Sequence, residues 1–422
     1  MKYIEAGHWK IANGFPPPLE KVLWPVTKSK PLPFDKLQYS VERINFPMRI
    51  TIVQGAFFPV PPIRGGAVEK VWLALGREFA KRGHAVTHIS RLCDDLPASE
   101  ILDGVHHVRV PGYDTPRSML ALKWRDLLYS RRVLKALPPA DILISNTFWL
   151  PLLARDATRG KLYVHVARFP KGQLSYYKRA ARLQCVSEAV AVAARVQCPA
   201  RRDIICTLPN PLPDGAWEPQ PLADAERRQI ILYAGRIHPE KGLDLLAQAW
   251  RQAHTRPELA GWKLVLAGPW AVAQGGGGEN YRSQLINQLP AGDSVEWTGP
   301  LFGSDGAKLH ALYRQARIFV YPSIAKLGES FGLAPLEAMA AGAPCIVSNL
   351  ACFQDFLNDK ESGLVFDYEA PAASTKLAEN IAMLANDPIL RTRLASAAWR
   401  TAAHFRVEEV ATRYLADFDA LL

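Results

Sequence analysis

Short apolar runs alternate with longer amphipathic stretches along most of the chain. The first run begins at Met48, where MRITIVQG predicts a buried strand that ends in a glycine turn. After a loop, AVEKVWLALGREFAKRG places Trp72, Leu75 and Phe79 on one helical face, and Gly83 lies just past its end. Further strands are predicted at HAVTHIS, VHHVRVP, DILISN, KLYVHV and RLQCVS. This alternation predicts a parallel sheet covered by helices.

The pattern restarts after TLPNPLPDGAWEPQPLADAERRQ, whose turn residues predict an interdomain linker. Beyond it, strands are predicted at QIILYAG, WKLVLAG, SVEWTG, RIFVYPS and APCIVS, with helical stretches between them. The glycine quartet Gly275–Gly278 lacks the spacing of a nucleotide-binding fingerprint and is interpreted as a flexible loop. The last stretch, WRTAAHFRVEEVATRYLADFDALL, predicts one amphipathic helix.

These elements predict an α/β fold of two Rossmann-like, doubly wound domains that face a central cleft. The predicted domains are residues 48–212, residues 213–396 and a C-terminal helix at 397–422 that is free to cross back to the first domain. Residues 1–47 hold seven prolines and no periodicity, which predicts a loop-like extension. The alternative is that Met48 is the true start of the protein.

Composition excludes several classes of protein. The chain has 422 residues, of which 49% are hydrophobic and 22% are charged, as in a soluble globular protein of two domains. It holds no apolar run of about 18 residues, and its N-terminus lacks the apolar core of a secretory signal. The six cysteines form no C-x-x-C pair and are predicted to be buried free thiols. We therefore expect a cytoplasmic protein.

The net charge of +11 is spread unevenly. Residues 1–210 carry a balance of +16, whereas residues 211–422 carry −5. A basic half indicates an anionic partner, for which nucleic acid, an anionic membrane surface and an acidic acceptor are all candidates. The alternative is a basic surface that is merely solvated.

The sequence YAGRIHPEKG places two cations, Arg236 and Lys241, directly after a predicted strand. A glycine turn at a strand end exposes backbone N–H groups, and two cations five residues apart can converge on one anion. This combination is typical of a phosphate site, although two ordinary surface cations are the alternative.

The sequence GESFGLAPLEAMAAG predicts a short helix that begins near Pro335 and ends at Gly342. The free N–H groups at the start of such a helix favour a phosphate. A carboxylate aimed at that phosphate would repel it, so Glu329 and Glu337 are expected to accept hydrogen bonds from hydroxyl groups. Two carboxylates beside an anion-binding turn indicate a site for a sugar nucleotide, unless Glu337 merely complements the helix dipole.

Two weaker signals lie in the first predicted domain. Gly65 and Gly66 precede a helix and permit the backbone to approach a phosphate closely. His165 ends an apolar run, where a buried structural histidine is the usual interpretation.

Together these residues resemble a known family: from Met48 onward, the chain is similar to the retaining GT-B glycosyltransferases of family 4, also called glycosyl transferases group 1. The resemblance rests on the RGG loop after the first strand, on GRIHPEKG, and on ESFGLAPLE followed by AMAAGAPCIVS. CVSEAV, PNPL and NDKESGLVF are lesser matches.

The resemblance implies a role for each matched residue. Arg236 and Lys241 would bind the donor diphosphate and stabilise the leaving group. Glu329 would hold the hydroxyls of the donor sugar, Glu337 those of the ribose, and His165 would lie near the reacting sugar. The catalytic set implied is His165, Arg236, Lys241 and Glu329. Further donor contacts are implied at Gly65, Gly66, Thr298, Gly299, Leu301, Ser330, Phe331, Gly332 and Leu333.

We therefore expect a retaining glycosyltransferase that moves a sugar from a nucleoside diphosphate sugar, UDP- or GDP-linked, to an acceptor hydroxyl in glycan, lipopolysaccharide or glycolipid synthesis. The resemblance implies no cofactor and no metal, in agreement with the lack of a D-x-D motif between strand and loop. The basic half is expected to dock on the inner, anionic face of a membrane near a lipid-linked or saccharide acceptor. The alternatives are a sugar-nucleotide epimerase on the same fold, a nucleic-acid-binding protein, and an inactive scaffold.

Overall fold

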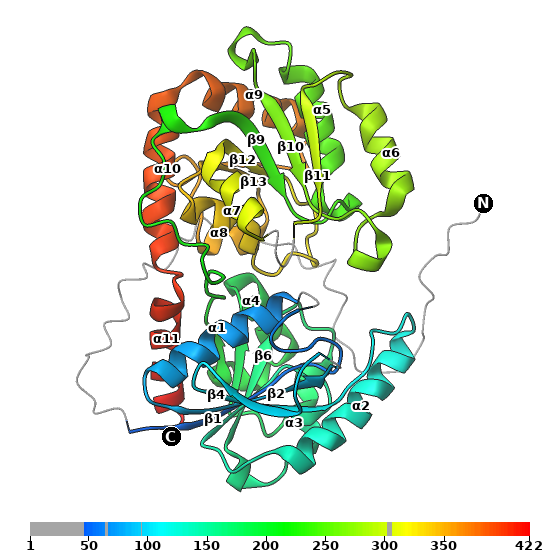
Figure 1. Ribbon diagram of the computed structural model, residues 1–422, viewed down its shortest axis with the longest axis vertical. Helices are drawn as coiled ribbons and strands as arrows, with labels where there is room; N and C mark the ends of the chain where they lie inside the picture. Colours follow the sequence, from blue (N-terminus) through cyan, green and yellow to red (C-terminus); the bar gives the residue numbers. More distant parts are fainter. Residues whose placement is uncertain (1–45, 64–65, 94, 302–305) are drawn as a thin grey trace. The chain divides into compact units, whose positions relative to one another are not determined.

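The computed structural model describes residues 46–63, 66–93, 95–301 and 306–422, and in these ranges strands and helices alternate as the sequence predicts (Figure 1). The strands form two separate sheets, each with helices on both faces. The prediction of an α/β fold with two parallel-sheet domains is confirmed.

The first sheet has eight strands in the order β3-β4-β2-β1-β5-β6-β7-β8. All neighbouring pairs are parallel except β3 and β4 at one edge. The apolar runs predict all of these strands except the short β3 and β8. The strands are β1 (Arg49–Val53), β2 (Ala85–Leu92), β3 (Ser99–Leu102), β4 (Val105–Pro111), β5 (Ile142–Ser145), β6 (Lys161–Val166), β7 (Arg182–Cys185) and β8 (Ile205–Thr207).

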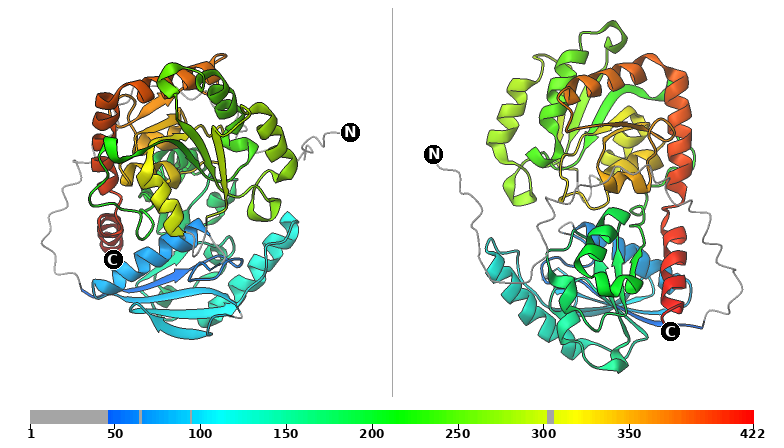
Figure 2. Two further views of the ribbon diagram at one scale, coloured as in Figure 1. Left: turned by 45° about the horizontal axis from the view of Figure 1, so that its top comes forward. Right: turned by 180° about the vertical axis from the view of Figure 1, so that it is seen from behind.

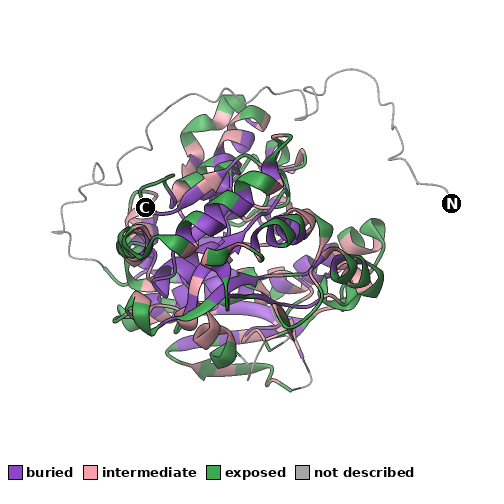
Figure 3. Ribbon diagram, turned by 90° about the horizontal axis from the view of Figure 1, so that it is seen from above, coloured by how far each residue is buried: buried purple, intermediate pink, exposed green. Residues whose placement is uncertain are grey.

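Two sets of helices cover this sheet. One face packs against α1 (Ala67–Lys81) and α11 (Val407–Asp419), where Trp72, Phe79, Tyr163, Tyr414 and Phe418 form an aromatic core. Side chains alternate along a strand, so the opposite face packs against α2 (Met119–Ala136), the short α3 (Leu150–Leu153) and α4 (Glu188–Gln197). Figure 3 shows the result, with buried residues along the strands and exposed residues on the outer sides of the helices.

The second sheet has six parallel strands in the order β11-β10-β9-β12-β13-β14. One face packs against α5, α6 and α9, and the other against α7, α8 and α10, an arrangement that Figure 2 shows from two directions. The strands are β9 (Arg228–Ala234), β10 (Lys263–Ala267), β11 (Val295–Gly299), β12 (Ala316–Tyr321), β13 (Cys345–Ser348) and β14 (Leu364–Phe366). The helices are α5 (Leu243–Ala253), α6 (Gly278–Gln288), α7 (Gly306–Gln315), α8 (Leu333–Ala340), α9 (Ala373–Asn386) and α10 (Pro388–Ala403).

The prediction of one continuous C-terminal helix is wrong. The chain breaks between α10 and α11, because Phe405 turns inward and is fully buried against Phe331 and Phe356. The Phe405 carbonyl also accepts a hydrogen bond of 2.7 Å from the backbone N–H of Leu212. Helix α11 begins after this break and packs against α1 of the first sheet.

Two further expectations concern the state of the cysteines and the presence of a membrane-spanning segment. All six cysteines are free thiols, and all are buried except Cys206, which is partly exposed. Among the described residues, no helix is both long and apolar enough to cross a membrane.

A buried polar cluster lies between the first sheet and the loop that leads to α1. His88 on β2 and His107 on β4 are directly paired in register, fully buried, and stacked with ring centroids 5.4 Å apart. The neighbouring Arg109 pairs with Glu100 and donates to the carbonyl of Val60. Burial lowers the pKa of His107 to about 4 and lowers the pKa of His88 well below its ordinary value.

This histidine pair predicts a pH dependence of stability. Because the folded pKa is depressed, the unfolded chain binds more protons as the pH falls from about 6.5 towards 4, and the folded protein loses stability in that window. The variant His107→Gln lacks one such group, so its free energy of unfolding should fall less steeply as the pH drops. The slope should be smaller than that of the wild type by up to roughly 1.4 kcal/mol per pH unit. Urea midpoints measured between pH 4 and 6.5 provide the test.

The control is His106→Gln, which replaces the exposed neighbour on the same strand. It should keep the pH dependence of the wild type. Equal pH dependence of the wild type and both variants would show that the buried pair does not control acid stability.

Candidate functional site

The predicted site residues of the second half gather at one edge of the second sheet. Strand order runs from β9 to β11 in one direction and from β12 to β14 in the other, so the winding reverses between β9 and β12. In open α/β sheets, the crevice at such a reversal, beyond the carboxyl ends of the strands, is where ligands bind. Arg236 and Lys241 follow β9, and Glu329 follows β12, so both segments meet at this point.

A buried ion pair joins the two segments. Lys241 Nζ lies 2.7 Å from Glu329 Oε2, and both side chains are largely shielded from solvent. The same carboxylate oxygen accepts hydrogen bonds from the hydroxyls of Tyr321, at 3.1 Å, and Ser323, at 3.3 Å. Burial and then the charge of Glu329 raise the pKa of the Tyr321 phenol well above its ordinary value, so the phenol keeps its proton. Oε2 of Glu329 thus accepts from three donors, which fixes the position of the carboxyl group.

Arg236 has a different partner in this structure. Its Nη2 lies 2.6 Å from Glu240 Oε1, and its Nη1 donates to the carbonyl of Gly275 at 2.7 Å. The side chain remains partly exposed. The two predicted cations therefore lie on one loop, but each is paired with its own carboxylate.

The loop after β9 packs tightly on the loop after β12. The backbone N–H of Ile324 donates to the Glu240 carbonyl at 3.0 Å. Gly242 has a φ of 67°, and a Cβ atom built there would lie 2.0 Å from the carbonyl oxygen of Pro322. Only glycine fits at that position, and this close approach brings Lys241 within reach of Glu329.

The glycine quartet is more ordered than the predicted flexible loop. The Gly277 N–H donates to the Ile237 carbonyl at 2.8 Å, and the Gly278 N–H donates to the Trp270 carbonyl at 2.7 Å. Gly278 is already the first residue of α6. Because the Gly275 carbonyl accepts from Arg236, the quartet positions one of the two cations.

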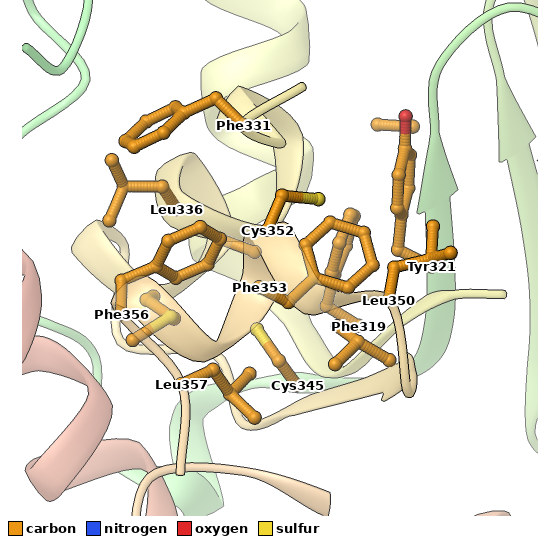
Figure 4. Packing of buried hydrophobic residues seen from close by; sticks show 14 of the residues in the cluster. Phe319, Tyr321, Phe331, Leu336, Cys345, Leu350, Cys352, Phe353, Phe356 and Leu357 are labelled. Atoms are coloured by element: carbon orange, nitrogen blue, oxygen red, sulfur yellow. The ribbon is translucent and has the colours of Figure 1, made fainter. Parts of the chain in front are cut away.

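Helix α8 begins at Leu333, two residues earlier than the predicted start at Pro335. Gly332 precedes it with a φ of 91°, which a residue with a side chain rarely adopts, and a Cβ there would lie 2.5 Å from the Phe353 ring. Phe331 turns away from the site and packs beside Phe356 at a centroid distance of 5.5 Å (Figure 4). Ser330 and the first N–H groups of α8 remain at the site edge, partly exposed.

Glu337 lies one turn into α8, not in its first turn, so the alternative that it merely complements the helix dipole is wrong. Its carboxyl is hydrogen-bonded to the Tyr313 side chain. Burial raises its pKa to about 7, against a smaller opposite effect of Lys70. Glu337 therefore exchanges a proton near neutral pH and can both donate to and accept from a hydroxyl.

Thr298 and Gly299 end β11, two strands away from the ion pair, and Leu301 follows two residues after the strand. The Gly268 N–H donates to the Gly299 carbonyl at 2.9 Å, and the Trp270 ring lies beside Gly299. In the part of the chain that the structure describes, no hydrogen bond joins these three residues to Lys241 or Glu329. They flank the same sheet edge without entering the ion-pair network.

The site residues predicted in the first half of the chain, where the structure describes them, lie on or beside the first sheet. Gly65 lies outside the described residues, and Gly66 precedes α1 with its backbone against the Glu69 carboxylate. His165 is buried near the carboxyl end of β6, with Nδ1 2.5 Å from Gln184 Oε1 and the Trp72 ring 5.2 Å away. Burial lowers its pKa to about 4, so His165 is neutral at physiological pH. No ion pair or hydrogen bond of the described residues links it to Lys241 or Glu329.

Three residues of the site are not predicted by the sequence patterns: Tyr321, Ser323 and Glu240. Tyr321 and Ser323 stand in RIFVYPS, which predicts a strand and gives no sign that its last hydroxyls face a carboxylate. Glu240 lies inside GRIHPEKG, four residues after Arg236. Had that segment been assigned as helical, the i, i+4 spacing would have indicated the pair.

Two family profiles match this chain. Residues 218–401 match the profile described as glycosyl transferases group 1, and residues 64–214 match glycosyltransferase family 4. Together they cover more than three quarters of the sequence, and the first includes both loops of the ion pair.

Curated relatives share part or most of the chain. D-inositol 3-phosphate glycosyltransferase of Salinispora arenicola is 33% identical over 181 residues, which are 43% of this chain and 38% of the relative. The match thus spans well under half the length of that relative. Lipopolysaccharide 1,2-N-acetylglucosaminetransferase of Salmonella typhimurium is 26% identical over 343 residues, covering 77% of this chain and 86% of the relative.

Solved structures share the fold. Sucrose-phosphate synthase of Thermosynechococcus elongatus superposes with a TM-score of 0.71 at 19% identity, covering 89% of this chain and 99% of the other. The Anabaena protein HepE, in complex with UDP and glucose, has a TM-score of 0.64 at 17% identity, covering 88% and 100%. At these identities the likeness concerns the fold alone.

The close approach at Gly242 predicts a large effect of a single methyl group. Gly242→Ala adds both a left-handed φ penalty and a clash with the Pro322 carbonyl, so the free energy of unfolding should fall by at least roughly 2 kcal/mol. Gly215→Ala is the matched control, because Gly215 has a φ of 75° and no atom within 4 Å. It should lose on the order of 1 kcal/mol. Chemical denaturation measures both, and equal losses would mean that the loop contact does not constrain the site.

Proposed function

Since the chain belongs to the glycosyl transferases of group 1, with a GT-B fold, we propose that it transfers a sugar from a nucleoside diphosphate sugar to an acceptor hydroxyl, with retention at the anomeric carbon. The observation that carries this proposal is the Lys241–Glu329 ion pair at the reversal of the second sheet, with Arg236 on the adjacent loop.

The donor diphosphate binds where the two cations can reach it. Lys241 and Arg236 are each neutralised by a carboxylate in the structure, so the site carries little net charge of its own. A diphosphate supplies a new anionic partner for both, and charge-assisted hydrogen bonds of this kind are among the strong ones. Glu329, released from Lys241, then accepts hydrogen bonds from the hydroxyls of the donor sugar.

The reaction forms a bond between the acceptor oxygen and the anomeric carbon while the bond from that carbon to the diphosphate oxygen breaks. The acceptor proton passes to the departing phosphate oxygen, so atoms and charge balance. Negative charge grows on the leaving diphosphate, and Lys241 and Arg236 stabilise it there more than in the ground state. No protein group needs to change its covalent state.

The nucleoside extends towards Glu337, whose carboxyl holds the ribose hydroxyls, and towards the end of β11 with Thr298, Gly299 and Leu301. UDP is the first nucleoside diphosphate to test, because HepE is a fold neighbour in complex with UDP and glucose. Between β11 and Glu337 in the sequence lie Ser330, Gly332 and Leu333. The Ser330 side chain and the N–H groups of the other two residues bind the sugar and phosphate. This assignment uses each predicted donor residue of the second half except Phe331, which packs beside Phe356.

The acceptor side lies on the first sheet. The neutral His165 lies near the carboxyl end of β6 there, and Gly66 directly precedes α1 at the same edge. We assign the acceptor to saccharides of glycan, lipopolysaccharide or glycolipid synthesis, a class that includes the reaction named for the Salmonella relative. The positive balance of residues 1–210 favours an anionic membrane surface as the place where a lipid-linked acceptor is met.

The test is calorimetric titration of UDP, GDP and ADP into the wild type and into Arg236→Ala/Lys241→Ala. We expect one nucleoside diphosphate to bind selectively, and the double variant to lose at least roughly 100-fold in affinity, since each charge-assisted bond contributes about 1.5–3 kcal/mol. The nucleotide that binds then identifies which nucleoside diphosphate sugars to use as donors in a transfer assay.

The matched control is Arg228→Ala/Lys263→Ala, which removes two exposed cations from the opposite edge of the same sheet. It should bind the nucleotide like the wild type. Failure of the folded wild type to bind any nucleoside diphosphate, or equal losses in both double variants, would contradict the proposal.

A further inference from the structure

Helix α2 exposes large apolar side chains at its N-terminal end. Leu120 is 82% exposed, Met119 64% and Trp124 60%. Residues 120 and 124 are one turn apart and share a face, which continues through the partly exposed Leu127 to Arg131 and Lys135. We call the surface formed by Met119, Leu120, Lys123, Trp124, Arg131 and Lys135 the α2 face.

Cations outnumber carboxylates around these apolar side chains, and the exposed Asp114 that precedes the helix is paired with Arg91. Within α2 there are five Lys and Arg residues and one carboxylate, Asp126, which is buried. Its Oδ2 accepts hydrogen bonds from the N–H groups of Phe148 and Trp149, so it faces the interior. Arg131 and Lys135 form no ion pair with any described carboxylate. The α2 face is therefore apolar at its tip and uniformly positive along its flank.

A second group of exposed residues lies close to the first. The 3-10 helix Gln173–Tyr176 carries Tyr176, which is 60% exposed, and is followed by the exposed Lys178 and Arg179. Phe148 connects the two groups. Its ring lies 5.2 Å from Lys123 Nζ, and its carbonyl accepts from the Tyr177 hydroxyl at 3.0 Å.

Both groups stand at the acceptor edge of the first sheet. A helix that follows a parallel strand begins beyond the carboxyl end of that strand, so the N-terminus of α2 lies at the edge where β4 ends. His165 lies at the end of β6 on the same edge, and the segment with Tyr176 follows directly. Figure 1 shows α2, in cyan, along the margin of this sheet.

We infer that the α2 face docks on an anionic lipid bilayer, with Met119, Leu120 and Trp124 inserted at the headgroup boundary and the flanking cations on the lipid phosphates. An apolar tip beside Lys and Arg, with no exposed acid on the helix itself, is the chemistry that a negatively charged interface binds. Docking here turns the acceptor edge towards the bilayer, and in that respect the inference rests on the proposed function. The bilayer contact itself does not require it.

The test is sedimentation of the full-length protein with two kinds of vesicle, one of phosphatidylglycerol and phosphatidylcholine, the other of phosphatidylcholine alone. The wild type should bind the anionic vesicles, and high salt should weaken that binding at least fivefold. Leu120→Gln/Trp124→Gln should bind them at least tenfold more weakly at low salt. Ile389→Gln is the matched control, because Ile389 is 81% exposed on α10 of the other domain, and it should bind like the wild type.

Calorimetric titration of the same variants with the nucleoside diphosphate separates this inference from the proposed function, because the α2 face is remote in sequence from Lys241 and Glu329. Unchanged nucleotide binding with lost vesicle binding supports the inference. Vesicle binding by the double variant equal to that of the wild type would overturn it. So would a wild type that binds neither vesicle but forms a dimer that Leu120→Gln/Trp124→Gln abolishes.

Discussion

A buried lysine needs a counter-charge, and in this protein that requirement joins two loops that are 88 residues apart in sequence. Lys241 follows β9, Glu329 follows β12, and the reversal of strand order between these two strands is what brings them together. The close contact of Gly242 with Pro322 sets the distance between the loops, and the hydroxyls of Tyr321 and Ser323 fix the carboxylate. The ion pair, the backbone contact and the sheet topology therefore depend on one another.

The pair also explains why the site suits a charged ligand that arrives and leaves. An ion pair in a low-dielectric setting contributes little net stability, because desolvation offsets attraction, so exchanging one carboxylate for a phosphate is not costly. Arg236 is held separately on Glu240 and the ordered glycine loop, at the partly exposed side of the site. A diphosphate that bridges Arg236 and Lys241 replaces two carboxylate partners at once. Glu329, once free of Lys241, still has the hydroxyls of Tyr321 and Ser323 as donors.

Much of the fold is predictable from the sequence, because parallel strands covered on both faces read as continuous apolar runs. The short strands β3, β8 and β14 escape this signal. The break at Phe405 does too, because only tertiary packing on Phe331 and Phe356 distinguishes Phe405 from a helical residue. For the site, Arg236, Lys241, Glu329 and Glu337 follow from motif spacing. Tyr321 and Ser323 do not, because their contact with Glu329 depends on how the loop after β12 folds back on the end of that strand. Likewise, charge counting indicates an anionic partner but cannot locate the α2 face, since exposure is decided by packing.

The measurement that tests the central claim most directly is a crystal structure of the protein with its preferred nucleoside diphosphate bound. The account predicts phosphate oxygens within about 2.7–3.2 Å of Lys241 Nζ and of the Arg236 guanidinium, with Glu240 and Glu329 no longer their only partners. A diphosphate bound elsewhere, with the Lys241–Glu329 pair and the Arg236–Glu240 pair unchanged, would contradict it.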